Sequence, residues 1–261
     1  EKINLAQIGR IYIPYNTDID IKKLKKTHNC DIYLWMPNIV SEKQYNFIKK
    51  SISHYEDIFN GVCVNNVGTF NFFRKVSNLN IHCGYFMNTM NSWTAKLLKE
   101  KGSQGYTFSI ESNIKDIEYM SNNNDMITEI VSYAYIQLMT MKNCPISLLK
   151  NCNSYKECDK CNIYNNYNLI DRKGIQFNID RNESITKLYN SVPLSIIGKA
   201  EKFNRCNIDY FFIDNKWVQD IGIVVDTLYK ELNNKNIDKS IKNKLLKENT
   251  FTRGHYFKNV L

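Results

Sequence analysis

Short apolar runs alternate with helical patterns along the first half of the chain. Four runs start at Gly61, Ile81, Gly105 and Ile127, so their starts are separated by 20, 24 and 22 residues. Each run is almost continuously apolar, which is typical of strands covered on both faces. Strands that alternate with helices over short connections are predicted to be parallel, because each helix returns the chain to the same end of the sheet.

Two segments between these runs predict helices. In residues 91–102, Ser92 is positioned to cap the start of a helix and Gly102 to end it. In residues 111–121 three apolar side chains fall on one helical face: Ile114, Ile117 and Met120. A further helix is predicted over residues 236–248, before an aromatic and basic tail.

Further strands are predicted at residues 31–37, 191–197 and 208–214, which brings the candidates to seven without residues 10–15 and 175–179. This pattern predicts an α/β protein with a TIM-like (β/α) barrel, at least a partial one, that carries a cysteine-rich insertion and a C-terminal tail. No glycine-rich phosphate loop follows a first strand, which argues against a dinucleotide-binding fold.

Residues 143–180 break this rhythm, because they are polar and rich in Asn and Cys. We therefore divide the chain into βα units at 1–142, a cysteine-rich segment at 143–190, and final strands with a C-terminal helix and tail at 191–261. A long segment without a core of its own can be ordered by a bound metal.

Four of the eight cysteines lie in this segment with the spacing C-x7-C-x5-C-x2-C: Cys144, Cys152, Cys158 and Cys161. Four thiolates can hold an iron–sulfur cluster or close a tetrahedral zinc site, and the spacing leaves both open. Cys63 and Cys83 lie inside apolar strands, so we expect them to be small buried hydrophobes. Cys206 is a candidate substitute ligand.

Polar residues follow the predicted strands, where the carboxyl ends of a parallel barrel form active sites. Asn66, Asn88 and Asn91 are candidates for substrate binding, and Glu111 is the candidate acid–base group. The alternative is that such residues only cap the helices that follow, as we expect of Asn113. No H-E-x-x-H or G-x-S-x-G motif is present, so the common hydrolase signatures are missing.

Charge and cysteine content bear on partners and compartment. The net charge of +9 fits an RNA partner through phosphate contacts, although abundant scattered Lys explains it equally. No apolar run reaches the length of a membrane span, and the first residues do not resemble a secretion signal. Eight cysteines in such a chain indicate a reducing compartment, and we expect the cytoplasm.

A set of short motifs lies between Met141 and Ser191. A Met precedes a Cys-Pro pair, then Tyr-x-Leu-x-Asp-Arg-x-Gly-x-x-Phe follows, and an Asn-Ser pair comes before an apolar run. Here these are Met141, Cys144, Pro145, Tyr167, Leu169, Asp171, Arg172, Gly174, Phe177, Asn190 and Ser191. Together these motifs resemble the signature region of peptidase family U-32, the collagenase-like peptidases. The stretches at 61–70, 84–102, 108–112 and 251–257 are also similar to that family, so the resemblance covers roughly residue 61 to the C-terminus.

The resemblance implies a TIM-like barrel whose later part holds a 4Fe–4S cluster on the four clustered cysteines, with zinc as the alternative. It implies hydroxylation of an RNA base or similar aromatic substrate, with Arg172 as a further substrate contact. Proteolysis, as the family name says, is the alternative, and a non-catalytic binding or maturation partner is the second alternative.

Three features depart from the family pattern. No Cys stands near Ser184, and Ala134 and Tyr135 replace a Gly-Arg pair. The family's first barrel strands, which should precede Ile11, are absent. We therefore expect one of two alternatives: the chain is a fragment, or a second chain completes the barrel.

Overall fold

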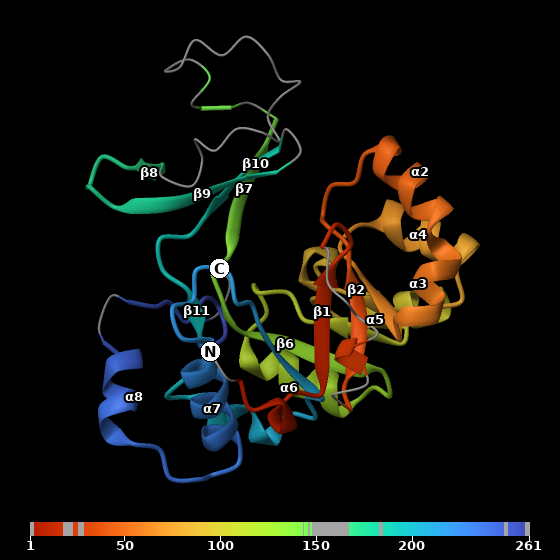
Figure 1. Ribbon diagram of the computed structural model, residues 1–261. Coiled ribbons are helices and arrows are strands. Elements are labelled where there is room, and N and C mark those ends of the chain that lie inside the picture. Colours follow the sequence, from red (N-terminus) through yellow and green to blue (C-terminus); the bar gives the residue numbers. More distant parts are fainter. Residues whose placement is uncertain are drawn as a thin grey trace.

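The computed structural model describes residues 3–17, 23–25, 29–142, 144–145, 147, 167–182, 185–247 and 250–258. Two sheets organise these residues (Figure 1). The larger one is curled and parallel, and the smaller one is antiparallel and joined to it through the end of one long strand.

The larger sheet has seven parallel strands and one short antiparallel strand. Its order is β1-β2-β3-β4-β5-β6, with β12 also beside β6 and β11 antiparallel to the end of β6. The strands are β1 (Arg10–Pro14), β2 (Asp31–Trp35), β3 (Gly61–Val64), β4 (Asn80–Cys83), β5 (Gly105–Thr107), β6 (Ile127–Ala134), β11 (Leu194–Ser195) and β12 (Tyr210–Ile213). The curled parallel sheet confirms the partial barrel. No backbone hydrogen bond joins β1 to β12 within the described ranges, so a closed TIM barrel is not shown.

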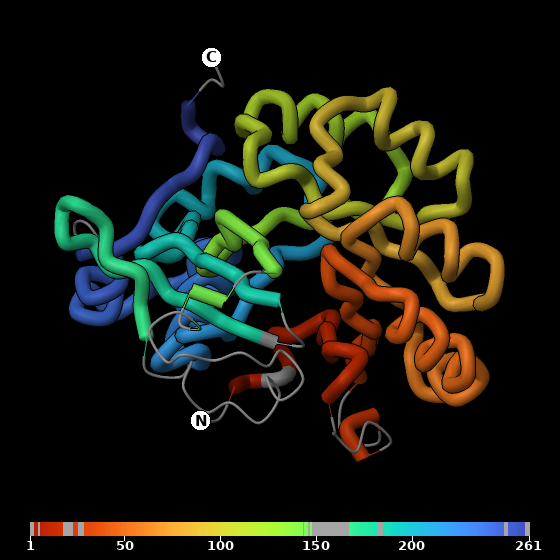
Figure 2. Tube along the Cα trace, turned by 90° about the horizontal axis from the view of Figure 1, so that it is seen from above, coloured from red at the N-terminus to blue at the C-terminus, as the bar shows by residue number. Residues whose placement is uncertain are grey.

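Helices follow most of the strands and cover the outside of the curl. They are α2 (Glu42–Lys50), α3 (Ile52–Ile58), α4 (Val67–Val76), α5 (Ser92–Glu100), α6 (Ile114–Asn122), α7 (Ile221–Leu232) and α8 (Lys239–Leu245). Figure 2 shows α2 to α5 as an arc on one side, with the small sheet and the C-terminal elements on the other. Short 3₁₀ helices are η1 (Leu5–Gln7), η2 (Tyr85–Met87) and η5 (Ala200–Arg205). In the described part of the chain no helix is both long and apolar enough to cross a membrane.

Asn side chains begin several of these helices. The predicted cap Ser92 is wrong by one residue: Asn91 is the cap and accepts a hydrogen bond from the Thr94 amide at 2.9 Å. An amide oxygen satisfies one of the amide groups that lack partners at a helix start. Gly102 ends α5 with φ of 101°, as predicted, because glycine adopts this left-handed conformation without strain.

The smaller sheet has the order β7-β10-β9-β8. Its strands are β7 (Gln137–Met141), β8 (Asn168–Ile170), β9 (Gln176–Asn182) and β10 (Ile185–Tyr189). The run predicted at 127–139 is therefore two strands, because the chain leaves the barrel after β6 and enters this sheet as β7. Figure 1 shows this sheet standing clear of the barrel strands.

Two further predictions of strands needed correction. Residues 10–15, not counted as a strand, form β1 at the edge of the barrel. Of residues 191–197, only Leu194–Ser195 form a strand, β11, which runs antiparallel to β6. The strand is short because Gly198 turns the chain with φ of 86°, and because the Pro193 carbonyl accepts a hydrogen bond from the Thr252 amide rather than from a strand of the sheet. The division of the chain into three parts stays a prediction.

Candidate functional site

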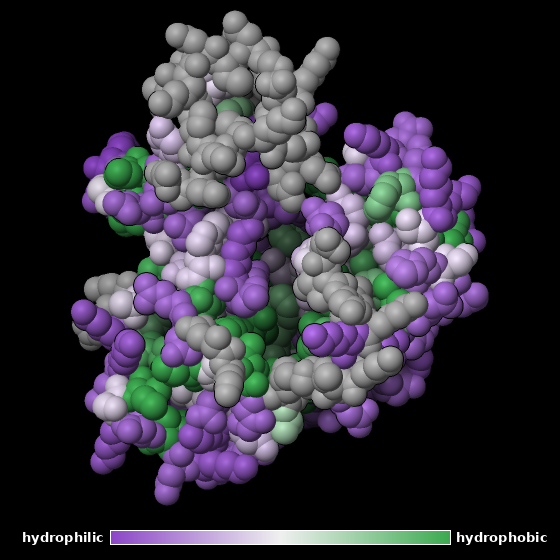
Figure 3. Space-filling view, in the orientation of Figure 1, coloured by the Kyte–Doolittle hydropathy of each residue, from purple (hydrophilic) through white to green (hydrophobic). Residues whose placement is uncertain are grey.

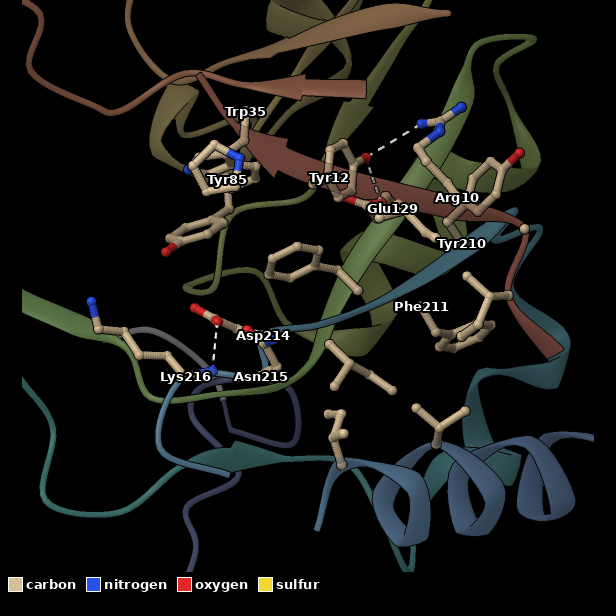
Figure 4. A pocket seen from close by; sticks show the side chains of 18 of the residues that line it. Arg10, Tyr12, Trp35, Tyr85, Glu129, Tyr210, Phe211, Asp214, Asn215 and Lys216 are labelled. Carbon is tan, nitrogen blue, oxygen red and sulfur yellow. Dashed lines mark hydrogen bonds between the residues drawn. The ribbon is translucent and has the colours of Figure 1, made fainter. Parts of the chain in front are cut away.

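A cavity of about 1130 Å³ lies inside the curl, between β1, β12 and the small sheet. The space-filling view shows the hollow at the centre of this face, with apolar walls inside a polar rim (Figure 3). Pockets of this size with a few polar groups are typical of ligand sites. Figure 4 shows two groups of polar side chains at opposite ends of the hollow, with aromatic rings between them.

The inner end is built around the carboxylate of Glu129, which is 2% exposed. It accepts hydrogen bonds from the Tyr12 hydroxyl at 2.8 Å and the Thr107 hydroxyl at 2.7 Å. His82 Nε2 lies 3.0 Å from the Thr107 Oγ1 and 3.6 Å from Glu129 Oε1. Burial alone raises the pKa of a carboxyl, but the hydrogen bond and charge of His82, with both hydroxyls, hold the pKa of Glu129 below its ordinary value.

Arg10 extends this network to the seam, the line along which the edge strands β1 and β12 face each other without a described backbone ladder. Its guanidinium lies 4.1 Å from the ring centroids of both Tyr33 and Tyr210, so it is stacked between two tyrosines. Its Nη1 lies 3.4 Å from His82 Nδ1 and from the Tyr12 hydroxyl. Planar guanidinium groups stack well on aromatic faces. Arg10 thus places a positive charge near the buried Glu129 carboxylate. It also provides a side-chain contact across the seam.

Aromatic rings form the wall of the cavity. Trp35 and Phe212 are stacked, with centroids 5.6 Å apart and planes at 10°. Tyr12 meets both of them edge-on, at 5.5 Å and 5.6 Å. Tyr85 lies 6.3 Å from Trp35 and completes the wall. These rings come from four different elements, so the curl of the sheet is what assembles them.

The outer end is formed by the loop after β12. Lys216 forms an ion pair with Asp180 of β9, and its ammonium lies 5.0 Å from the rings of Tyr189 and Trp217. Trp217 has φ of 58°, which is strained for a bulky side chain. Its ring packs edge-on against Tyr189 at 4.7 Å. The loop therefore fastens the small sheet to the mouth of the barrel.

Two titratable groups at this outer end have shifted pKa values. Burial raises the pKa of Asp214, although the Lys216 amide and the charges of Lys216 and Lys187 act against the shift. Burial, followed by the charge of Lys216, lowers the pKa of Lys187. Opposite shifts in a carboxyl and an amine within one cavity mark a candidate site for binding or proton transfer.

The polar residues predicted from the sequence lie elsewhere. Asn66 and Asn91 cap α4 and α5, and Asn88 accepts a hydrogen bond from the Ser109 hydroxyl at 2.6 Å. Glu111 is exposed on the loop after β5, and Arg172 is exposed in the turn between β8 and β9. These five residues do not line the cavity. Their roles in binding and catalysis stay predictions.

The cysteine cluster falls mostly outside the described residues. Cys144 is described and is 5% exposed, whereas Cys152, Cys158 and Cys161 are not among the described residues. No group of three or more His, Cys, Asp or Glu residues in the described ranges is arranged to hold a metal. Convergence of the four thiols is therefore still a prediction.

Three of the four cysteines outside the cluster are buried, and Cys30 is partly buried. Cys63 and Cys83 are fully buried in β3 and β4, which confirms that they are core residues. Burial raises the pKa of Cys83 to about 11, and burial also raises the pKa of Cys206 to about 11. Both are therefore thiols at neutral pH. A role of Cys206 as a substitute ligand stays a prediction.

The residues that line the cavity were missed in the sequence. Arg10 and Tyr12 lie in a segment that was not counted as a strand. Glu129 is the one charged residue in the apolar run of β6, and Lys187 is likewise the one charged residue in β10. A charged residue inside an apolar strand is costly unless it is paired or functional, and this was the available signal.

Comparisons with known proteins agree with the resemblance found in the motifs. The model of peptidase family U32 matches residues 18–259. A solved structure described as the U32 peptidase Mk0906 aligns with a TM-score of 0.41 and 11% sequence identity, over 54% of this chain and 66% of that one. The aligned part thus spans just under two thirds of that structure. No curated protein matches this chain.

Proposed function

This chain belongs to peptidase family U32, and on that premise we propose that it is an enzyme that hydroxylates an RNA base or similar aromatic group in the cavity. The observation that carries the proposal is the aromatic wall. Trp35 and Phe212 present parallel planes beside Tyr12 and Tyr85. A planar ring stacked on such a wall gains about 1–3 kcal/mol.

The charge of the chain supports an RNA substrate. A net charge of +9 attracts a polyanion, and phosphate contacts would supply affinity without reading sequence. The seam between β1 and β12 supports it as well, since in the described chain only side chains join the two strands there, and separation of those side chains would admit one residue of a long chain.

The donor set supports a cysteine-held cofactor. Cys144, Cys152, Cys158 and Cys161 would hold a 4Fe–4S cluster, and four thiolates equally suit zinc. Cys144 lies three residues beyond the end of β7 and is buried. A buried position suits a metal ligand better than an exposed one. Hydroxylation of a ring C–H is a two-electron oxidation that needs an oxygen donor and an electron acceptor from outside the chain, and a bound cluster would carry the electrons to that acceptor. The residues of the cavity would bind the ring, orient it and exclude water.

Proteolysis is the second candidate, because the family takes its name from it. A peptidase needs a nucleophile or an activated water. Among the described residues His82 is held by Arg10, Thr107 and Glu129 rather than by a Ser or Cys nucleophile. Asp214 is the cavity residue best suited to activate a water, since within the described ranges its carboxylate accepts a hydrogen bond from a backbone amide alone.

Anaerobic purification tests the proposal. We expect a brown protein that absorbs near ~400 nm and contains iron, as thiolate-bound clusters do. We also expect nucleosides to bind in the cavity and Trp35→Ala to abolish that binding, with exposed Trp93→Ala as the matched control. A colourless zinc protein that cleaves casein, and whose cleavage is lost in Asp214→Asn, would establish the peptidase instead.

A further inference from the structure

Three polar groups at the outer end of the cavity have no hydrogen-bond partner for their functional atoms within the described part of the chain. These atoms are the Tyr85 hydroxyl, the Lys187 ammonium and the second carboxylate oxygen of Asp214. Among the described residues, the Asp214 side chain accepts a single hydrogen bond, from the Lys216 amide to Oδ1 at 2.9 Å. The side chains of Tyr85 and Asp214 point into the same end of the hollow (Figure 4).

These groups reach the cavity from three separate elements. Tyr85 begins η2 after β4, and Asp214 follows β12. Lys187 lies on β10, where alternate residues Ile185, Lys187 and Tyr189 all line the cavity, as the two-residue period of a strand requires. The small sheet thus contributes one face to the site.

The neighbouring ion pair explains which groups are available. Lys216 is engaged by Asp180, whereas Lys187 forms no ion pair with a described residue. The charges of Asp214 and Lys187 nevertheless shift each other's pKa, and the charge of Asp214 also raises the pKa of Tyr85. All three groups line the same cavity, on the side where the small sheet and the loop after β12 meet it. A ligand that covers these groups must satisfy them, because a polar group buried without a partner is costly, and this requirement gives selectivity.

The hydrogen-bonding capacity of the three groups specifies the ligand. A carboxylate only accepts, an ammonium only donates, and a phenol does either. A hydroxyl group both donates and accepts, so it can donate to Asp214 while it accepts from Lys187 or Tyr85. A purely anionic group is disfavoured because the Asp214 carboxylate would oppose it.

We propose that Tyr85, Lys187 and Asp214 form a subsite for the ribose hydroxyls of a ribonucleoside whose base stacks on Trp35 and Phe212. The inference rests on the proposed function, since it takes the stacked ring to be a nucleobase, and it adds selection of ribose over deoxyribose. The sugar is attached directly to the base, so its hydroxyls fall beside the wall. The 2′-hydroxyl is the group by which a protein distinguishes RNA from DNA.

Binding of the four ribonucleosides and their 2′-deoxy counterparts to the full chain tests the subsite by isothermal titration calorimetry. We expect ribonucleosides to bind about tenfold more tightly than the deoxy forms, as one lost hydrogen bond predicts. Asp214→Asn and Lys187→Met should each reduce this ratio to near one, because they weaken the binding of ribonucleosides more than that of deoxynucleosides. Asp125→Asn and Lys99→Met, which alter an exposed ion pair, are the matched controls.

The outcomes separate this inference from the proposed function. Equal affinity for both sugars in the wild type, with binding still lost in Trp35→Ala, overturns the ribose subsite and leaves the aromatic site standing. No nucleoside binding at all overturns both. Tyr85→Phe removes only a hydroxyl from a side chain whose ring stays in place, so it tests the subsite even if a charge variant fails to fold.

Discussion

The Tyr12 hydroxyl donates a hydrogen bond to Glu129 at 2.8 Å, across the interior of the curled sheet and over 117 positions of sequence. The same tyrosine meets Trp35 and Phe212 with its ring edge. Tyr12 thus connects the buried charge network to the aromatic wall. We therefore expect a substitution of Glu129 to change both the stability of the fold and the packing of the rings that line the cavity.

Glu129→Gln should lower the free energy of unfolding by about 2–4 kcal/mol, because removal of one charge from a buried network leaves its partners uncompensated. The partners that lose their anion are His82 and Arg10. Urea denaturation measures the loss, and Glu111→Gln on an exposed loop is the matched control. A change below about 0.5 kcal/mol, typical of surface sites, would contradict the network.

Asp214→Asn should stabilise the fold at neutral pH. Burial raises the pKa of Asp214 above its ordinary 3.8, so the native state binds more protons than the unfolded state between these two values. The unfolding free energy of the wild type therefore falls as pH rises through that window, and the variant lacks this loss. Lys187, Lys216, Tyr85 and Tyr189 face this carboxyl and are unchanged in the variant.

Thermal melts of both proteins from pH 3.5 to pH 8 check the sign of this effect. The difference between the variant and the wild type should be small at the acidic end and grow with pH. A difference that is largest at acid pH would contradict a raised pKa. Asp125→Asn serves as the control at each pH, because Asp125 is exposed and its pKa is lowered by its hydrogen bond to Lys99.

Lys216→Met should loosen the small sheet from the barrel mouth with little effect on global stability. The ion pair with Asp180 is about a third exposed, so its contribution to the free energy of unfolding is about 1 kcal/mol or less. Hydrogen exchange should nevertheless speed up in β9 and β10 and stay unchanged in β3 and β4. Equal exchange in all four strands would show that the loop does not fasten the sheet.

Cys144→Ala should reduce the metal content of anaerobically purified protein by most of its value, because a four-thiolate site loses a ligand. Cys30→Ala is the control, since Cys30 is only partly buried and lies outside the cysteine-rich segment. Metal analysis with absorption spectra gives the readout. Full metal retention in Cys144→Ala, with loss in Cys206→Ala, would move the site to another ligand set.

The sequence predicted the repeating part of the fold better than its edges. The strands of β2 to β6 and helices α5 and α6 were found because apolar runs and helical faces repeat with a fixed period. β1 was passed over because Arg10, Tyr12 and Pro14 interrupt its apolar pattern. These three residues line the cavity, so the apolar pattern of a strand is interrupted where its residues form the site.

The candidate site was harder to predict for a related reason. Asn66, Asn91 and Glu111 follow strands in a barrel, which is where active sites form, yet two of them cap helices and one is exposed. The cavity instead takes Tyr12 from the first strand and Asp214 from the last. Only the curl of the sheet brings these together, and contact between its two edges cannot be read from spacing.

The seam between β1 and β12 has a mechanical consequence. The two edges meet through Arg10 against Tyr210 and Tyr12 against Phe212, without a backbone ladder between them in the described chain. Rings slide past one another at far lower cost than a row of hydrogen bonds breaks. Parting of these two edges would therefore break side-chain contacts but no described backbone ladder, and it would open the cavity along its length rather than at one end.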